Sequence, residues 1–279
     1  MLSLLHMQAG DGLLQVLAWQ MQLGMAGLVV ICLFAFAVGA CLGSFANACA
    51  MRLVRDEDFI FAKSRCRGCD RPLSWWQNLP LIGWLTARGR CATCGSQIGF
   101  RYLLVEILMG LVLVAYMIML PTAMVIGFTF ALALIAIACL TDFEAMTLHP
   151  LLLSILGFAG LLLAVGGQAG FFAWHLTSGQ ALLGAILTGG FPFVINAGFR
   201  RLRGTDGFGE GDFWLMAAIG AWLGPVAGVA LFIVASWLGA IAGIFLMVTS
   251  KATISTRLPF GLFAGGAFIL WPNLFTRVF

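Results

Sequence analysis

Two aspartates beside apolar segments are the residues in this sequence that are best suited to catalysis. The chain has only 11 acidic residues among 279. Asp142 ends one apolar segment, and Asp212 opens another within the stretch Gly209-Glu-Gly-Asp212. An ionisable side chain beside hydrocarbon is costly, so it is by default a candidate for a functional role. We therefore take Asp142 and Asp212 as the candidate catalytic pair.

Two carboxyl groups held close together can share one proton, because both ionise only with difficulty. One group can then act as a base on water while the other acts as an acid toward a carbonyl oxygen, as in aspartic proteases. This chemistry needs neither a metal ion nor a nucleophilic side chain. The alternative is that the two acids only mark helix ends, since an acid such as Asp212 favours a helix N-terminus.

Four residues around the aspartates are candidates for substrate binding. Gly209 and Gly211 would allow a peptide backbone to approach Asp212 closely. Glu144 and Glu210 could attract a basic segment of a substrate, although a role as simple solvated acids explains them equally well.

Two Cys-x-x-Cys pairs form the second candidate site. They have the spacing of a tetrahedral zinc ribbon, in which four thiolates leave no open position, so the zinc would be structural. Zinc would also stabilise a loop of about 50 residues that has too little core to fold unaided. Gly68 and Gly95 fit the tight turns of such a site. Incidental cysteines and a redox dithiol are the alternatives. The four predicted ligands are Cys66, Cys69, Cys91 and Cys94.

The composition defines the class of protein that must position these residues. Hydrophobic residues make up 62% of the chain and charged residues 9%, against about 45–50% and about 25% in soluble domains. These values exclude a soluble globular enzyme, and they exclude disorder, which requires low hydrophobicity. We expect an all-α polytopic membrane protein with about eight transmembrane helices and a cytoplasmic zinc-ribbon-like loop.

The expected spans follow from stretches of about 20 mostly apolar residues. Residues 213–248 are too long for one span, and Pro225 predicts a short hairpin pair there. Residues 1–24 are interrupted by glutamines and favour a surface helix. The other expected spans are 25–50, 102–120, 123–140, 150–165, 180–199 and 258–275.

The basic residues predict the orientation in the membrane. The first 51 residues contain no Lys or Arg, whereas nine lie between Arg52 and Arg101. The positive-inside rule places this loop in the cytoplasm and brings both aspartates to the cytoplasmic face. It also explains the positive charge without nucleic acid, which is not an expected partner. We divide the chain into residues 1–50, the cysteine loop 51–101, and a membrane domain 102–279.

An ordered set of motifs resembles the type IV prepilin leader peptidases, which are membrane aspartic peptidases of pilus and type II secretion systems. The resemblance covers most of residues 39–265. Its motifs are Gly43-Ser-Phe-Ala-Asn47, the cysteine loop with Asn78-Leu-Pro80, Asp142, Gly209-Glu-Gly-Asp212 and Pro259-Phe-Gly261.

The resemblance implies that Asp142 and Asp212 are the catalytic pair. It implies cleavage of a basic leader after a Gly, next to the hydrophobic helix of a prepilin or pseudopilin, at the cytoplasmic face of the bacterial inner membrane. Membrane lipid would then surround the protein and is an expected partner. Many members also methylate the new N-terminal amine with S-adenosylmethionine, an activity linked to the cysteine-loop half. Glu106, early in the second span, could contribute to that transfer or hydrogen-bond a neighbouring helix.

Two departures from the family pattern are visible. The stretch Leu148-His149-Pro150 stands where members usually have Leu-Pro-Asp, and Trp214 stands where they usually have Lys. Both put substrate contacts in doubt, and neither removes a candidate catalytic residue. Two rival functions stay open: another intramembrane protease of the GxGD type, and a non-enzymatic transporter or scaffold whose zinc loop docks a partner.

Overall fold

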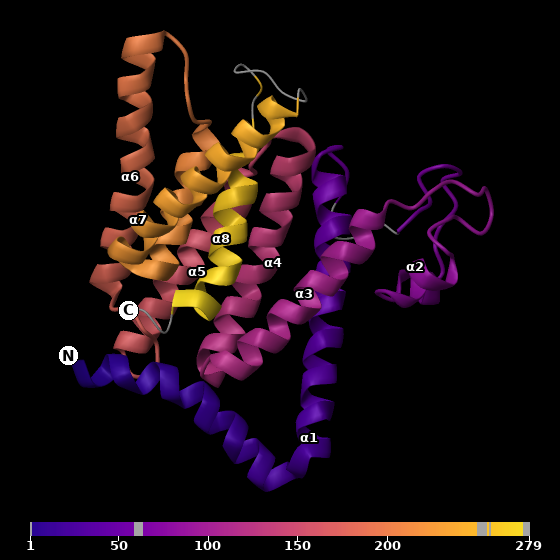
Figure 1. The fold of residues 1–279 in the computed structure, drawn as a ribbon, viewed down its shortest axis with the longest axis horizontal. Helices are drawn as coiled ribbons and strands as arrows, with labels where there is room; N and C mark the ends of the chain where they lie inside the picture. Colours follow the sequence, from indigo (N-terminus) through magenta and orange to yellow (C-terminus); the bar gives the residue numbers. More distant parts are fainter. Residues whose placement is uncertain (1, 59–63, 250–255, 257, 276–279) are drawn as a thin grey trace. The chain divides into compact units, whose positions relative to one another are not determined.

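The structure is a computed structural model, and it describes residues 2–58, 64–249, 256 and 258–275. Helices dominate these residues, and no strand is formed within them beyond two isolated bridges. Figure 1 shows the helices in chain order. They are α1 (Leu2–Leu53), η1 (Trp75–Asn78), α2 (Ile82–Thr86), α3 (Phe100–Met119), α4 (Thr122–Ala145), α5 (Pro150–Gln168), α6 (Ser178–Arg203), α7 (Glu210–Val248) and α8 (Phe260–Phe275).

The helices confirm an all-α polytopic membrane protein. In the described part of the chain, six are long and apolar enough to cross a membrane: α1 from Ala18 onward and α3 to α7. The helix α8 is apolar but shorter. Eight spans were expected, and two of them were the halves of a hairpin over residues 213–248. These residues lie within the single helix α7, which accounts for one of the two spans by which the numbers differ.

The helix α7 is broken at Gly224, which has φ 79° and is followed by Pro225. A positive φ of this kind favours glycine, and proline cannot continue a helix ladder. Along the first half of α7, the contacting residues of α6 fall in number from 189 to 184, and along the second half they rise from 188 to 191. The two halves of α7 therefore run in opposite directions along α6. These contacts pair Gly189 with Ala217, Gly184 with Gly220 and Gly224, Thr188 with Gly228, and Phe191 with Phe232.

The helix α1 is broken at Gly24, where φ is 69°. This break coincides with the expected boundary between the surface segment 1–24 and the first span. Beyond it, α1 lies against α3 (Figure 1). Gly39 and Gly43 allow the backbones to approach, because a Cβ on Gly39 would lie 2.4 Å from the Met109 carbonyl oxygen. Small residues serve this role in membrane helix packing.

The chain forms two compact units, which are described separately below. The first unit comprises Met1–Ile137 with Pro272–Phe279, and the second comprises Ala138–Trp271. The first unit therefore contains the cysteine loop, and the second contains both candidate aspartates. The sequence-based division at residues 51 and 102 stays a prediction.

Candidate active site and metal centre

Asp142 lies near the end of α4 and is buried, with 5% of its surface exposed. Its Oδ2 accepts a hydrogen bond from the backbone N–H of Leu262, at 3.2 Å. Leu262 belongs to the first turn of α8, whose backbone N–H groups have no partner within the helix and attract negative charge. Gly261 backs the carboxylate, because a Cβ there would lie 2.8 Å from Asp142 Oδ2. The start of α8 is thus shaped to receive this carboxyl group.

Asp212 lies in the first turn of α7. Its Oδ2 accepts a hydrogen bond from the backbone N–H of Gly209, at 2.8 Å. Gly209 is the N-cap residue, so Asp212 reaches back across the first turn as the third residue of a capping box does. This hydrogen bond explains the spacing of Gly209-Glu-Gly-Asp212. Asp212 therefore stabilises the N-terminus of α7 and also belongs to the candidate site.

The second unit brings the two aspartates together. Gly261, which backs Asp142, and Gly211, which precedes Asp212, both lie against Leu148. Leu148 packs on both sides of the site: a Cβ on Gly211 would lie 2.7 Å from Leu148 Cβ, and one on Gly261 would lie 3.2 Å from Leu148 Cδ2. The end of α4 and the starts of α7 and α8 therefore converge on one place.

The predicted substrate-binding residues lie around this place with different exposures. Gly209, Glu144 and Glu210 are exposed. Gly211 is partly buried under Leu148, so its missing side chain makes room for packing. Their part in substrate binding stays a prediction.

Three groups at this site were not identified from the sequence: Gly261, the N–H of Leu262, and Asn196. Gly261 belongs to the Pro259-Phe-Gly261 motif, which was the available signal. Asn196 is buried near the end of α6, and a single amide in an apolar helix could have indicated it. The N–H of Leu262 gives no signal, because every residue except proline carries one.

The four predicted metal ligands converge in the first unit. Their sulfur atoms all lie within 4.8 Å of one another, and Cys66 Sγ is 3.6 Å from Cys94 Sγ. Four sulfurs bound to one tetrahedral zinc ion at 2.3 Å would lie about 3.8 Å apart. The arrangement therefore fits zinc. It also fits the expectation of a closed, structural site, since all four positions come from cysteine.

The two cysteine pairs form matching turns. The N–H of Cys66 donates to Arg71 O at 2.9 Å, and that of Cys91 donates to Ser96 O at 2.8 Å. In each turn the residue after the second cysteine has a positive φ, which is 56° at Asp70 and 71° at Gly95.

Gly68 and Gly95 both belong to these turns, as predicted: Gly68 lies in the turn between Cys66 and Cys69, and Gly95 has the positive φ of the second turn. Gly68 is also needed for space, because a Cβ there would lie 2.7 Å from Ser96 Oγ. The position that takes the turn conformation in the first pair is Asp70, a residue type that tolerates it better than most.

Hydrogen bonds at the cluster favour the thiolate form of two cysteines, whereas sharing among the sulfurs raises the pKa of Cys69. The Ser96 hydroxyl, assisted by the N–H of Gly68, lowers the pKa of Cys66 to about 6. The same hydroxyl lowers the pKa of Cys94. The thiolate is the form of cysteine that binds metal, so Ser96 prepares two of the four sulfurs for a cation.

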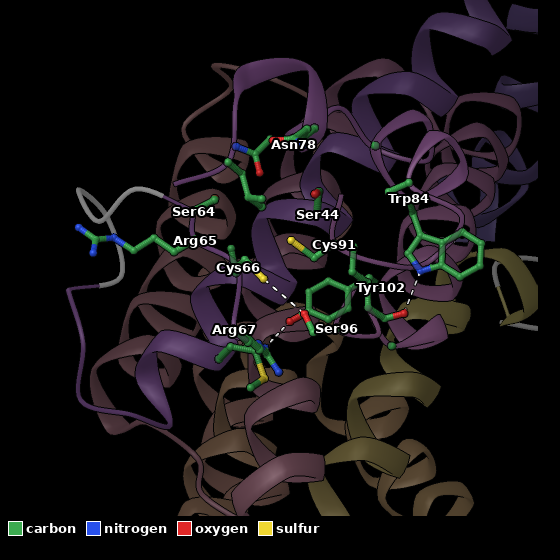
Figure 2. Close-up of a pocket in the computed structure, with 18 of the residues that line it drawn as sticks. Ser44, Ser64, Arg65, Cys66, Arg67, Asn78, Trp84, Cys91, Ser96 and Tyr102 are labelled. Carbon is green, nitrogen blue, oxygen red and sulfur yellow. Dashed lines mark hydrogen bonds between the residues drawn. The ribbon is translucent and has the colours of Figure 1, made fainter. Parts of the chain in front are cut away.

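A cavity of about 590 Å³ adjoins the cysteine cluster within the first unit (Figure 2). Glu106 of α3 lines it and is buried, and its Oε2 accepts a hydrogen bond from the N–H of Leu81 at 2.7 Å. Leu81 has φ 62°, which is strained for a bulky residue. Glu106 therefore holds the loop as well as facing the cavity. Arginines also line it: Arg52, Arg55, Arg65, Arg67 and Arg90.

Two protein families have models that match this chain, one in each half. The model of the bacterial peptidase A24 N-terminal domain matches residues 37–120, and that of the type IV leader peptidase family matches residues 128–244. A prepilin leader peptidase/N-methyltransferase of Klebsiella pneumoniae is 33% identical, over 68% of this chain and 84% of the relative. The chain belongs to the type IV leader peptidase family. It is therefore classed among the peptidases, and not among the transporters or scaffolds that the sequence left open.

Other members of this family are similarly related. The prepilin leader peptidase/N-methyltransferase of Aeromonas hydrophila is 34% identical, over 79% of this chain and 75% of the relative. That of Myxococcus xanthus is 34% identical over 71% of this chain, and the match spans 58% of that relative. No solved structure gave a significant match. The two matched regions contain the cysteine cluster and the two aspartates respectively, while α8 lies beyond both.

Proposed function

We propose that this protein is a prepilin leader peptidase of the bacterial inner membrane, which removes a basic leader after a Gly at the cytoplasmic face. The observation that carries this proposal is the placement of Asp142 and Asp212 on either side of Leu148 in the second unit, each with a carboxylate oxygen that accepts a hydrogen bond from a backbone N–H. Such acids at the end of apolar helices suit a peptide bond that lies next to a hydrophobic helix.

In this mechanism one aspartate takes a proton from water, and the water oxygen forms a bond to the scissile carbonyl carbon. The other aspartate donates a proton to the carbonyl oxygen. The carbon–nitrogen bond then breaks as the first aspartate passes the proton from water to the leaving amine. The carbonyl group re-forms as its hydroxyl returns a proton to the second aspartate. The N–H groups of Leu262 and Gly209 orient the two carboxylates, so that neither must reorganise before it reacts.

Charge and apolar surface near the pair suit the substrate. Exposed Glu144 and Glu210 would attract a basic leader, and exposed Gly209 would allow its backbone to approach. Phe143 and Trp214, which are both about half exposed, offer apolar surface to the adjoining hydrophobic helix. With the two halves of α7 and the helix α8 counted as separate segments, the chain would cross the membrane eight times with its cysteine loop in the cytoplasm, as its arginines favour.

A second activity, N-methylation of the new terminus, is supported by the names of the relatives and by the cavity beside the cysteine cluster. S-adenosylmethionine would supply the methyl group. Glu106 would face the cationic part of this donor, a cavity arginine such as Arg52 would pair with its carboxylate, and Trp84 or Tyr102 would contact its adenine. Zinc on the four cysteines would hold the walls of the cavity in place.

The experiment that tests the peptidase uses purified protein and a synthetic prepilin segment with a basic leader, a Gly and an apolar helix. Mass spectrometry would detect the product. Asp142→Asn and Asp212→Asn should each lower kcat by on the order of 10²–10⁴-fold, because each removes one proton-transfer group. Asp56→Asn, at an exposed loop acid of the first unit, is the matched control and should cleave normally. Cleavage that persists in either catalytic variant would exclude this mechanism.

A further inference from the structure

A buried amide in α6 contacts the loop that precedes Asp212. Asn196 is 9% exposed, and its Oδ1 accepts hydrogen bonds from the N–H groups of Gly207 at 2.7 Å and Phe208 at 3.0 Å. Its Nδ2 donates to Asp206 Oδ1 at 3.0 Å. One side chain therefore satisfies three groups of a short loop.

The next residue of the same loop serves Asp212. Gly207, Phe208 and Gly209 present three successive backbone N–H groups: the first two go to Asn196, and the third goes to Asp212 Oδ2. Each peptide group is planar, and only two rotatable dihedrals at a Cα separate it from the next. Fixing the first two N–H groups therefore restricts the position of the third. Asn196 thus affects the position of Asp212 indirectly, through the backbone of the loop.

Phe208 extends this linkage to the other aspartate. Its ring lies 5.2 Å from that of Phe260 and 5.8 Å from that of Phe232, measured between centroids. Phe260 opens α8, and two residues later the N–H of Leu262 donates to Asp142. The loop that Asn196 holds therefore packs on the turn that holds Asp142.

We infer that Asn196 is a positioning residue for the proposed peptidase, which clamps the loop 206–209 so that both aspartates keep their reactive geometry. This inference rests on the proposed function, because it gives Asn196 a role in that reaction. A misplacement of about 1 Å can cost on the order of 10²-fold in rate. Loss of the clamp should therefore lower kcat while substrate binding changes little.

The first test compares Asn196→Leu with Thr188→Val in detergent-solubilised protein, using the same synthetic prepilin segment. Asn196→Leu keeps the size of the side chain but removes all three hydrogen bonds between Asn196 and the loop. We expect kcat to fall at least tenfold and KM to change less than threefold. Thr188 is a buried polar residue of the same helix whose hydroxyl has no hydrogen-bond partner in the structure, so Thr188→Val should leave kcat unchanged. An unchanged kcat in Asn196→Leu would overturn the inference.

A reciprocal exchange separates positioning from general destabilisation. Asn196→Asp keeps the acceptor but sets a carboxylate against Asp206, so kcat should fall. Asp206→Asn alone should stay near wild type, because its amide oxygen still accepts from Asn196. The double variant restores every donor and acceptor and should recover most of the lost kcat. It loses only the exposed pair of Arg200 with Asp206, which is worth little. Failure of the double variant to recover would contradict the clamp.

Hydrogen–deuterium exchange gives a readout that does not depend on activity. Asn196→Leu should speed exchange at the amides of residues 207–209, whereas Thr188→Val should not. Unchanged exchange would refute the clamp, and faster exchange with normal kcat would refute its role in positioning. If the wild-type protein cleaved no prepilin segment, the proposed function would fail, and the exchange data would still decide whether Asn196 holds the loop.

Discussion

At the scale of single residues, the two aspartates depend on backbone N–H groups from very different distances along the chain. Asp212 is served by Gly209, three residues away, within one helix cap. Asp142 is served by Leu262, which is 120 residues away. The environment of Asp142 therefore exists only when α4 and α8 are packed together, and Asp142 should be the more sensitive of the two to changes in packing.

Gly261 offers a direct test of that sensitivity. Gly261→Ala places a methyl group 2.8 Å from Asp142 Oδ2, so the carboxylate must move. We expect kcat to fall by on the order of 10-fold to 10²-fold, as small misplacements of catalytic groups do. Gly266→Ala in the same helix is the control, because a Cβ there meets nothing within 4 Å. Equal activity of the two variants, measured by cleavage of a prepilin segment, would show that this contact is unimportant.

Residue type decided which parts of the site could be predicted. Asp142 and Asp212 were identifiable because charged groups are conspicuous in an apolar chain. The four cysteines were identifiable because their spacing is specific. Leu262 acts through its backbone, which gives no signal. Gly261 had a signal in its motif and Asn196 had one as an amide in an apolar helix, but their roles depend on contacts that exist only in the fold. The same limit applies to the space that Gly68 needs, because this need arises from Ser96 in the other turn.

At the scale of elements, the cysteine loop depends on a few contacts for its order. Its two turns carry matching backbone hydrogen bonds and bring four sulfurs together, and its helices η1 and α2 are short. A metal ion would supply the cross-link that so small a segment otherwise lacks.

Replacement of one ligand should therefore remove the metal. We expect purified wild-type protein to contain close to one zinc ion per chain and Cys66→Ser to contain much less, with faster proteolysis of the loop. Cys41→Ser, at an exposed position of α1 outside the cluster, is the control and should keep its zinc. Elemental analysis by mass spectrometry checks this result. Equal zinc in the two variants would rule out the ribbon.

The loop between α5 and α6 contains His175, from which we predict how the stability of the fold depends on pH. His175 Nε2 lies 2.9 Å from Trp222 O, and burial lowers the pKa of His175 to about 4. The unfolded chain would bind a proton near pH 6.5 while the folded chain would not. The contribution of His175 to the free energy of unfolding is thus complete above pH 6.5 and is lost as the pH falls toward 4.

Thermal unfolding in detergent between pH 7 and pH 4.5 measures this effect. His175→Gln should flatten the fall of Tm with pH, because Gln does not titrate. His149→Gln, at an exposed position before α5, should reproduce the wild-type slope. A parallel slope in His175→Gln would show that His175 has the same pKa in the folded and unfolded states.

Element boundaries were predictable where glutamines or a proline interrupt an apolar run. The breaks at Gly24 and at Gly224 with Pro225 lie where the sequence placed them. The register of the two halves of α7 on α6 could not be predicted, because it depends on contacts such as that of Thr188 with Gly228. Apolar periodicity carries little information in these helices, since lipid and protein interior both favour apolar side chains.

At the scale of the whole molecule, two units hold two different kinds of site. The first unit contains the cysteine cluster and the cavity with Glu106, and the second contains Asp142 and Asp212. Each of the two family models matches one of these sites. If the cavity is the methylation site, a change confined to the cavity should separate methylation from cleavage.

Glu106→Gln is the sharpest such change. Gln keeps an acceptor for the N–H of Leu81, so the loop should stay in place and only the negative charge is lost. Hydrogen bonds to charged groups are worth about 1.5–3 kcal/mol, so methylation should fall by about 10-fold to 10²-fold. Cleavage should stay within twofold of wild type. Glu57→Gln is the matched control, because Glu57 lines the same cavity but is exposed and pairs with exposed Arg55 at 4.0 Å.

One mass spectrum of the processed prepilin segment reports both activities, since removal of the leader and addition of a methyl group change the mass separately. Parallel loss of cleavage and methylation in Glu106→Gln would mean that the two reactions share a site or that the variant misfolds. Normal methylation would exclude Glu106 from binding the donor. Cleavage without methylation in the wild-type protein would refute the second activity alone, because the aspartates that carry the first lie in the other unit.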